Sequence, residues 1–128
     1  MTRPPFLLLV DDDAELTDVL ADALALEGFA VRVAHDGESG LALAGDDTGL
    51  VLLDLRMPGI SGFDFVRRYR ERRGLLTPIY VFSALRHAHR VARSIGADGV
   101  VQKPFDLDEL IRLAERHLTR RSSHAAAS

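Results

Sequence analysis

Apolar residues gather in five short runs along the chain, and a stretch with helical spacing follows each run. Residues 6–10 (FLLLV) and 49–55 (GLVLLDL) are apolar without alternation, which is typical of strands buried on both faces. Further strands are predicted for residues 29–34 (FAVRVA), 79–83 (IYVFS) and 99–102 (GVVQ). Five strand–helix units in a row predict an α/β fold, in which helices cover both faces of a parallel sheet.

The helices of these units are predicted from helical periodicity and from capping residues. They are expected over residues 14–27, 38–44, 62–73, 86–95 and 107–119. Ser61 and Asp106 are predicted N-caps, and Gly28 and Gly96 are predicted stops. The residues expected to face the core are Leu16, Val19, Leu20, Ala23 and Leu24 in the first helix, Phe63, Phe65 or Val66, and Tyr69 in the third, and Leu107, Leu110, Ile111 and Leu118 in the last.

Polar residues stand where four of the predicted strands end. In open parallel sheets the working groups lie beyond the carboxyl ends of the strands. If the strands are ordered 2-1-3-4-5, the first and third strands are neighbours and their terminal residues converge. The residues at these ends are Asp11, Asp12 and Asp13 after the first strand, Asp54 at the third, Ser83 at the fourth and Lys103 after the fifth.

This set of side chains predicts phosphoryl transfer onto an aspartate. Carboxylates held within a few ångströms raise one another's pKa and need a cation, and their hard oxygens suit Mg²⁺, with Mn²⁺ as an alternative. An ammonium and a hydroxyl nearby can bind phosphoryl oxygens. Taken singly, an aspartate after a strand is more often a cap and a serine more often a loop hydroxyl, so the joint placement is what favours a site.

The composition of the chain is consistent with this hypothesis and excludes several other classes of protein. The chain has 128 residues, which is the size of one domain, and 47% hydrophobic with 27% charged residues is ordinary for a soluble globular protein. No apolar run approaches the roughly 20 residues of a membrane helix, and MTRPPF does not resemble a secretory signal. Cysteine is absent, which excludes disulfide and thiolate chemistry and fits a cytoplasmic location.

The charges are distributed unevenly between the two halves of the chain. Residues 1–54 hold twelve acidic residues against two arginines, whereas residues 55–128 hold fourteen basic residues against seven acidic ones. The basic runs RRYRERR (67–73) and RHAHRVAR (86–93) have helical spacing, so solvated helix faces explain them better than direct nucleic-acid binding. Fifteen of the sixteen basic residues are arginine, and the one lysine is Lys103.

The segments LLVDDD, LLDLRMPGISG, VFSA, GAD and KPF resemble, in this order, the receiver domain of bacterial response regulators. The likeness extends from about Phe6 to Leu118 and implies a flavodoxin-like (βα)5 fold with strand order 2-1-3-4-5. We expect the domain to span residues 1–119, with residues 120–128 as a flexible tail or the start of a linker.

The resemblance also implies a role for each site residue. It implies a domain that takes a phosphoryl group from a histidine kinase phosphohistidine, in a Mg²⁺-dependent reaction, and then switches conformation. Asp13 is expected to cap the first helix rather than bind metal. The roles are Asp54 as phosphoacceptor, Asp11, Asp12, Asp54 and the backbone carbonyl of Arg56 as metal ligands, Ser83 and Lys103 as switch and phosphate-binding residues, and Pro104 as the site of a cis peptide bond.

Four positions bear on how such a switch works in this chain. Val100 stands where the family commonly has an aromatic switch residue, and only thirteen steps separate Ser83 from Gly96, so the fourth helix is expected to be short. Arg56 and Leu85 occupy positions that tune dephosphorylation in the family. Because Leu85 cannot orient an attacking water by a hydrogen bond, a long-lived phosphoryl group is predicted.

The implied partners are a sensor histidine kinase or phosphotransfer protein and a downstream output protein or domain. We expect no membrane contact, no direct nucleic-acid binding by this chain, and a monomer or weak dimer that is a signalling switch rather than a turnover enzyme. The alternative is a phosphorylation-independent interaction module with an atypical output face, which Val100 and the short fourth helix favour. An aspartate-nucleophile phosphatase is disfavoured, because Arg56 stands where such enzymes place a second aspartate.

Overall fold

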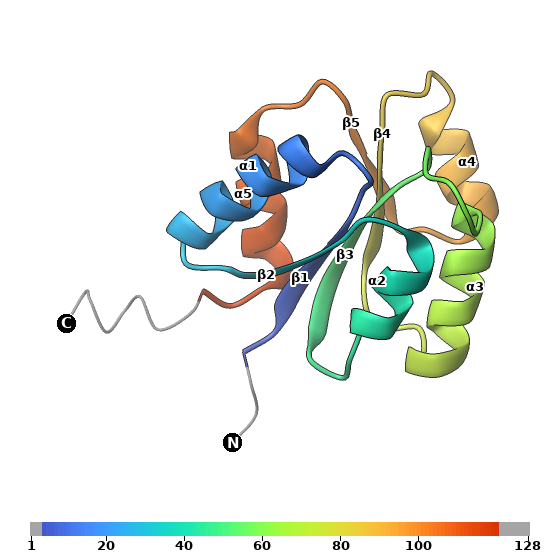
Figure 1. The fold of residues 1–128 in the computed structure, drawn as a ribbon, viewed down its shortest axis with the longest axis horizontal. Coiled ribbons are helices and arrows are strands. Elements are labelled where there is room, and N and C mark those ends of the chain that lie inside the picture. Colours follow the sequence, from blue (N-terminus) through green and yellow to red (C-terminus); the bar gives the residue numbers. More distant parts are fainter. Residues whose placement is uncertain (1–3, 121–128) are drawn as a thin grey trace.

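The computed structural model describes residues 4–120 as a five-stranded parallel sheet flanked by five helices (Figure 1). The sheet order is β2-β1-β3-β4-β5, as predicted. The strands are β1 (Phe6–Val10), β2 (Ala30–Ala34), β3 (Thr48–Asp54), β4 (Ile79–Ser83) and β5 (Gly99–Gln102). The helices are α1 (Ala14–Leu26), α2 (Gly37–Leu43), α3 (Gly62–Arg73), α4 (Ala88–Ile95) and α5 (Leu107–His117).

Two apolar layers enclose the sheet. On one face α1 and α5 pack on the strands through residues such as Leu24 and Leu110. On the other face α2, α3 and α4 pack through residues such as Leu41, Phe65 and Ile95 (Figure 1). All five residues of β1 are buried because both of its faces are covered, which explains its continuous apolar run.

Three residues predicted to face the core are exposed instead. Val19 is 65% exposed, Phe63 53% and Leu107 41%. Val19 lies beside the stripe that Leu20 and Leu24 form on α1, and the sheet does not reach it. Phe63 and Leu107 lie within the first two residues of helices that begin beyond the carboxyl edge of the sheet, where little sheet surface remains to cover them.

The helix ends follow the predicted capping with small shifts. The side chain of Ser61 accepts a hydrogen bond from the backbone N–H of Asp64, and Asp106 begins α5 in a capping box with Glu109. Gly96 ends α4 in the left-handed conformation. The α4 helix begins at Ala88, two residues later than predicted, and has eight residues, so the expected short fourth helix is confirmed.

A polar network ties the amino edge of the sheet together. One carboxylate oxygen of Asp98 accepts hydrogen bonds from the backbone N–H of Ile79 at 2.8 Å and from the guanidinium of Arg70 at 3.0 Å. Arg70 also donates to the carbonyl of Thr77, whose hydroxyl accepts from the hydroxyl of Tyr69 at 3.0 Å. The network fixes the start of β4 against α3.

The same edge holds a close approach of the two ends of the domain. A Cβ added at Gly49, in β3, would lie 2.6 Å from a methyl of Leu118 and 2.8 Å from the Cβ of Pro5. Only glycine leaves room for both neighbours.

Among residues 4–120, no helix combines the length and the apolar character needed to cross a bilayer.

Candidate functional site

Three aspartates meet at the carboxyl edge of the sheet, where β1 and β3 end side by side. One carboxylate oxygen from each of Asp11, Asp12 and Asp54 lies within 4.8 Å of the others. Asp11 is 1% exposed and Asp54 6% exposed, whereas Asp12 is open to solvent. The predicted convergence of the strand ends therefore takes place, and two of the three carboxylates are held in the protein interior.

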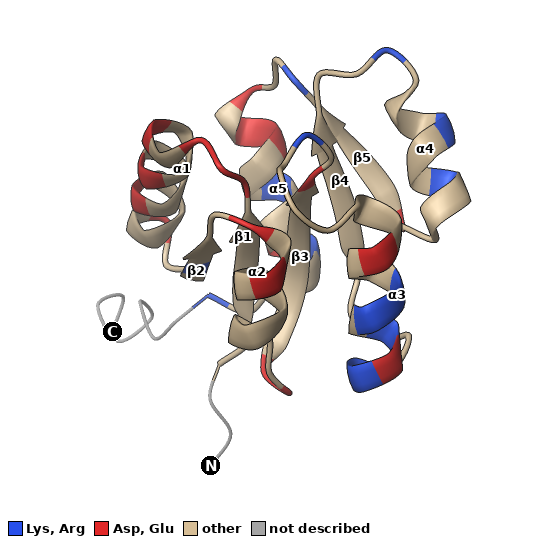
Figure 2. Cartoon of the chain, turned by 45° about the vertical axis from the view of Figure 1, so that its right-hand side comes forward, with Lys and Arg blue, Asp and Glu red and all other residues tan. Residues whose placement is uncertain are grey.

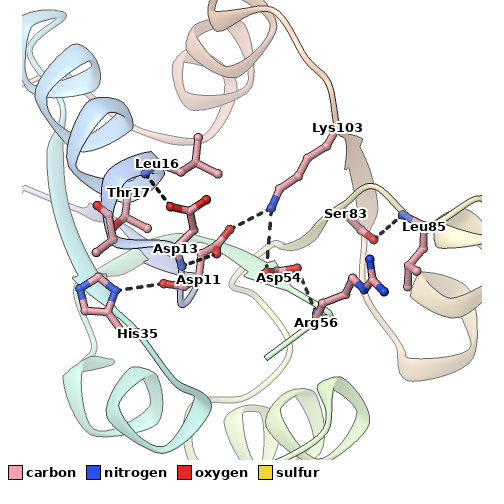
Figure 3. Close-up of polar contacts among 11 residues, drawn as sticks. Asp11, Asp13, Leu16, Thr17, His35, Asp54, Arg56, Ser83, Leu85 and Lys103 are labelled. Carbon is pink, nitrogen blue, oxygen red and sulfur yellow. Dashed lines mark hydrogen bonds and ion pairs between the residues drawn. The ribbon is translucent and has the colours of Figure 1, made fainter. Parts of the chain in front are cut away.

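Asp11 and Asp13 have separate tasks within the run of aspartates (Figure 3). The backbone N–H of Asp11 donates to the carbonyl of Ala34 at 3.0 Å, which extends the pairing of β1 with β2 by one residue. One carboxylate oxygen of Asp11 accepts from the N–H of Asp13 at 3.0 Å. The carboxylate of Asp13 in turn accepts from the N–H of Leu16 at 3.1 Å, so the prediction that Asp13 caps the first helix is confirmed.

The surroundings of the Asp54 carboxyl group disfavour its ionised form. Burial raises the pKa of Asp54, and the nearby charge of Asp11 raises it further. The N–H of Arg56, which donates to one carboxylate oxygen at 3.0 Å, and the ammonium of Lys103 lower the pKa of Asp54 only in part. A cation bound at this edge would therefore stabilise the ionised form of Asp54.

Lys103 supplies the one ammonium at this edge. Its Nζ lies 3.1 Å from an oxygen of Asp11 and 3.9 Å from an oxygen of Asp54, and it stands 4.4 Å from the centre of the Phe82 ring. Its backbone N–H donates to the carbonyl of Ser83 at 2.8 Å, and the peptide bond to Pro104 is cis. The side chain therefore spans from β5 to the aspartates (Figure 3).

Ser83 lies beside the aspartates on β4 and is fully buried. Its hydroxyl oxygen accepts from the N–H of Leu85 at 3.0 Å, and the amide of Gln102 donates to the carbonyl of Leu85 at 3.1 Å. No hydrogen bond within residues 4–120 joins the Ser83 hydroxyl to an aspartate. Ser83 therefore holds the loop that leads into α4, and its hydroxyl proton remains available to another acceptor.

The donor set fits a small, hard divalent cation. Asp11, Asp12 and Asp54 bring three carboxylates to one point, and Lys103 balances only one of their charges. The pKa of Asp54 is raised mainly by burial and also by the neighbouring charge of Asp11, so a cation would favour its ionised form. Carboxylate oxygens with an approach from solvent, which the exposed Asp12 provides, are the environment in which Mg²⁺ binds while keeping several waters.

Two neighbours of the site were not assigned a role from the sequence. The ring of His35 contacts the backbone carbonyl of Asp11 at 3.0 Å through Nδ1, and the ring of Phe82 lies under the Lys103 ammonium. The position of His35 could have been predicted from the register of β1 and β2. Val10 pairs with Ala34, so the residues that follow each of them, Asp11 and His35, are neighbours.

Comparison with known sequences gives a consistent set of matches. A sequence profile of the response regulator receiver domain matches residues 7–115. The transcriptional regulatory protein CpxR of Klebsiella pneumoniae is 44% identical over 107 residues, which cover 82% of this chain and 45% of CpxR. The response regulator protein PmrA of Pseudomonas aeruginosa is 42% identical over 123 residues, which cover 94% of this chain and 55% of PmrA. The chain thus spans about half the length of the curated relatives it matches.

Solved structures with the same architecture agree with these matches. The chemotaxis protein CheY4 of Vibrio cholerae superposes with a TM-score of 0.79 and 28% identity, over 91% of this chain and 100% of CheY4. The response regulator TrrA of Thermotoga maritima, solved in complex with Mg²⁺ and a beryllium fluoride, superposes with a TM-score of 0.76 and 32% identity, over 88% of this chain and 97% of TrrA.

Proposed function

The chain belongs to the response regulator receiver domains, the signalling switches of two-component systems, and we propose that its phosphoacceptor is Asp54. The observation that carries this assignment is the meeting of Asp11, Asp12, Asp54 and Lys103 at the carboxyl edge of the sheet. Asp54, at the end of β3, is proposed as the nucleophile because the Lys103 ammonium lies 3.9 Å from its carboxylate, where it can offset the negative charge that a phosphoryl group brings. The matches give no support to the alternative of a module that works without phosphorylation.

The proposed reaction is an in-line transfer from a phosphohistidine. A carboxylate oxygen of Asp54 attacks phosphorus, the P–O bond forms as the P–N bond breaks, and the imidazole of the donor leaves as it takes up a proton. The donor is a histidine kinase or a phosphotransfer protein. Lys103 orients the phosphoryl oxygens and offsets their charge, since its ammonium already stands 3.9 Å from Asp54.

Receiver domains bind Mg²⁺ at an acidic pocket, and the carboxylates of this chain fit the ion. We assign Asp11, Asp12, Asp54 and the backbone carbonyl of Arg56 as its ligands, and Mn²⁺ is an acceptable substitute. When bound, the ion supplies positive charge beside the oxygens of the transferring group. Asp11 is held for this task by the N–H of Asp13, and Asp54 by the N–H of Arg56.

The proposed switch begins at Ser83. A phosphoryl group on Asp54 offers new acceptor oxygens, and the buried Ser83 hydroxyl would turn to donate to one of them. The hydrogen bond from Leu85 to Ser83 would then be lost, and the loop that leads into α4 would move. Val100 replaces the family's aromatic residue, so in this chain the motion is carried by the loop and by Gln102 rather than by an aromatic rotamer.

The phosphoryl group leaves by hydrolysis that the domain itself assists, with Arg56 and Leu85 as the tuning positions. The domain is proposed to be a monomer or weak dimer over residues 1–119, working in the cytoplasm, where phosphoryl donors made from ATP are found. It controls an output protein or domain without contacting membrane or nucleic acid. Residues 120–128 are proposed as a tail or linker, and residues 1–3 and 121–128 lie outside the described part of the chain.

The test is phosphorylation in vitro. We expect wild type with Mg²⁺ and acetyl phosphate, or with a histidine kinase, to gain one phosphoryl group by intact-protein mass spectrometry. Asp54→Asn should gain none. Asp13→Asn is the matched control, because it removes the same charge from an aspartate outside the cluster of three and keeps a capping side chain. A wild type that stays unmodified with both donors would contradict the proposal.

A further inference from the structure

A row of side chains lies at the carboxyl edge of the sheet, on the face that α1 and α5 cover. Side chains alternate between the two faces of a strand, so residues two apart share a face. Asp11 therefore shares a face with Leu9, which is a core residue beneath α1 and α5. Asp54 lies on that face as well, two residues after Leu52, and pairs with Phe82 across β3 and β4. From β1 to β4 the row thus consists of two aspartates and a phenylalanine.

Lys103 reaches this row from the edge of the sheet. It follows β5, the outermost strand, whereas Asp11 follows β1, and β3 and β4 lie between them. Its Nζ nevertheless lies 3.1 Å from an oxygen of Asp11, so the side chain crosses the carboxyl ends of the two middle strands (Figure 3). At β4 it meets the ring of Phe82, whose centre lies 4.4 Å from Nζ.

The ring of Phe82 is held firmly in place. Its side chain is fully buried, and the ring of Phe105 packs against it with centroids 4.9 Å apart and planes tilted by 60°. Tilted pairs of this kind are a favoured arrangement of aromatic rings. Because Lys103 and Phe105 belong to the same short segment after β5, Phe82 contacts both the ammonium and the ring of that segment.

Lys103 is the one cation that contacts the buried aspartates in the described part of the chain. Among residues 4–120, its ammonium is the only side-chain cation within 4.0 Å of a carboxylate oxygen of Asp11 or Asp54. Figure 2 shows basic residues gathered on α3 and α4, away from the acidic run between β1 and α1. The position of this one ammonium therefore decides how well a side chain of the domain can meet the charge of a phosphoryl group on Asp54.

The two carboxylates do not fix the ammonium by themselves. The nearest oxygen of Asp54 is 3.9 Å from Nζ, which is too long for a hydrogen bond. Asp11 is close enough at 3.1 Å, but its carboxylate is also assigned to the metal, so its pairing with Lys103 is shared. The ring of Phe82 is the third neighbour, and it has no such competing ligand.

We propose that Phe82 is a positioning residue: the negative face of its ring holds the Lys103 ammonium where it can meet a phosphoryl group on Asp54. This cation–π attraction arises from the ring quadrupole and grows as the pair is removed from water. The side chain of Lys103 is only 23% exposed, which favours it. The role toward the phosphoryl group rests on the proposed function, whereas the contact between ring and ammonium does not.

The first experiment measures the contact itself by NMR. Lys103 is the only lysine in the chain, so isotope-labelled lysine gives signals from this one side chain. In the unphosphorylated wild type its Cε protons should resonate upfield of those in the unfolded chain, because the face of an aromatic ring shields protons above it. Phe82→Leu should lose this shift. Phe65→Leu, which removes a buried ring from the opposite core, should keep it. An unshifted wild-type signal would overturn the proposal.

The second experiment separates cation–π attraction from packing. Phe82 is replaced in turn by mono-, di- and trifluorinated phenylalanine, which withdraw electron density from the ring face in steps and change the ring's size little. Each ring is combined with Lys103→Met, and urea denaturation gives the coupling between the two changes. The coupling, expressed as a ratio of unfolding equilibrium constants, should fall with each fluorine and by at least about threefold over the series. An equal coupling for every ring would reduce Phe82 to a packing role and overturn the proposal.

The link to phosphorylation is measured with beryllofluoride, a mimic of the phosphoryl group, in the presence of Mg²⁺. With Lys103 in place, beryllofluoride affinity should fall at least about threefold from phenylalanine to trifluorophenylalanine at position 82. The same series at Phe65 should leave the affinity unchanged.

The outcomes distinguish this inference from the proposed function. If wild type binds beryllofluoride and the series at Phe82 has no effect, the function of Asp54 stands and the positioning role fails. If wild type neither binds beryllofluoride nor gains a phosphoryl group, the proposed function fails and takes the role toward the phosphoryl group with it. The NMR shift and the fluorine-dependent coupling then still decide whether Phe82 holds Lys103.

Discussion

The two edges of the sheet differ in how their charged groups are paired. At the carboxyl edge, Asp11 and Asp54 are buried together and share one ammonium, and the pKa of Asp54 is raised as a result. At the amino edge, Asp98 meets the N–H of Ile79 and the guanidinium of Arg70, each at 3.0 Å or less. The first edge lacks positive charge, and the second has its polar groups paired.

This difference separates the function of the fold from its stability. An edge whose charges are unbalanced is stabilised when it binds a cation or loses a charge, so it is suited to chemistry. An edge whose polar groups are paired is destabilised when any one of them is removed. Substitutions at the two edges should therefore affect different measurements.

The largest expected effect is on metal binding at the carboxyl edge. Asp12→Ala should weaken Mg²⁺ binding at least about tenfold, because it removes one carboxylate of a cluster of three. Asp13→Ala should leave Mg²⁺ affinity within about twofold, and should instead cost about 1 kcal/mol of unfolding free energy through the lost helix cap. Isothermal titration with Mg²⁺ and urea denaturation measure the two quantities. Equal losses of affinity would show that the run of aspartates is not divided between metal and cap.

At the amino edge the expected effect is on stability. Asp98→Ala should lower the free energy of unfolding by about 1–3 kcal/mol, because the buried start of β4 keeps an N–H without a partner. Phosphorylation of Asp54 by acetyl phosphate should persist. Asp46→Ala is the control, since Asp46 is fully exposed and its pair with Arg73 should contribute within about 1 kcal/mol. Loss of phosphorylation in a folded Asp98→Ala chain would show that the amino edge also affects the chemistry at Asp54, which would contradict the separation of the two edges.

A smaller effect concerns the lifetime of the phosphoryl group. Leu85 has no side-chain donor or acceptor, so wild-type phospho-Asp54 should outlast a few seconds. Leu85→Asn should shorten this lifetime about threefold or more, because the amide side chain of asparagine can orient an attacking water by a hydrogen bond. Decay of the phosphorylated species is followed by mass spectrometry after the donor is removed. Loss of the wild-type phosphoryl group within seconds would contradict the assigned role of Leu85.

The smallest effect is a pH dependence of stability in the absence of metal. Because the pKa of Asp54 is raised on folding, ionising it costs folding free energy as pH rises through the unfolded value of about 3.9. The Asp54→Asn variant should therefore gain stability relative to wild type between about pH 4 and pH 7, and the gap should close below about pH 4. Urea denaturation in EDTA measures the gap. A gap that widens as pH falls would reverse the inferred sign.

The sequence predicted the carboxyl edge better than the amino edge. The five strands follow from apolar runs that end in charged residues, whereas their order, on which the meeting of Asp11, Asp12 and Asp54 depends, was assumed and is implied by the family resemblance. The Asp98 network could not be predicted, because it depends on the packing of α3 against β4 rather than on any periodic pattern. The position of His35 against Asp11 likewise required the register of β1 and β2.

Two of the three errors at the surface, those at Phe63 and Leu107, share one physical origin. Periodicity reports which side chains share a helix face, and it does not report how far the sheet extends beneath them. Phe63 and Leu107 lie on the correct faces of α3 and α5, in first turns that overhang the carboxyl edge. Apolar residues in the first turn after a strand are therefore weaker evidence of a core than those further along the helix.

The close approach of both Pro5 and Leu118 to Gly49 makes the domain suitable for circular permutation. Both residues come within 3 Å of one added Cβ position, so a linker of a few residues could join the original ends of the domain. New ends could be opened between Gly74 and Thr77, where Leu75 and Leu76 are 80% and 96% exposed. The old and new ends would both lie at the amino edge of the sheet. A reporter domain attached at the new ends would therefore leave the approach to Asp54, at the carboxyl edge, uncovered.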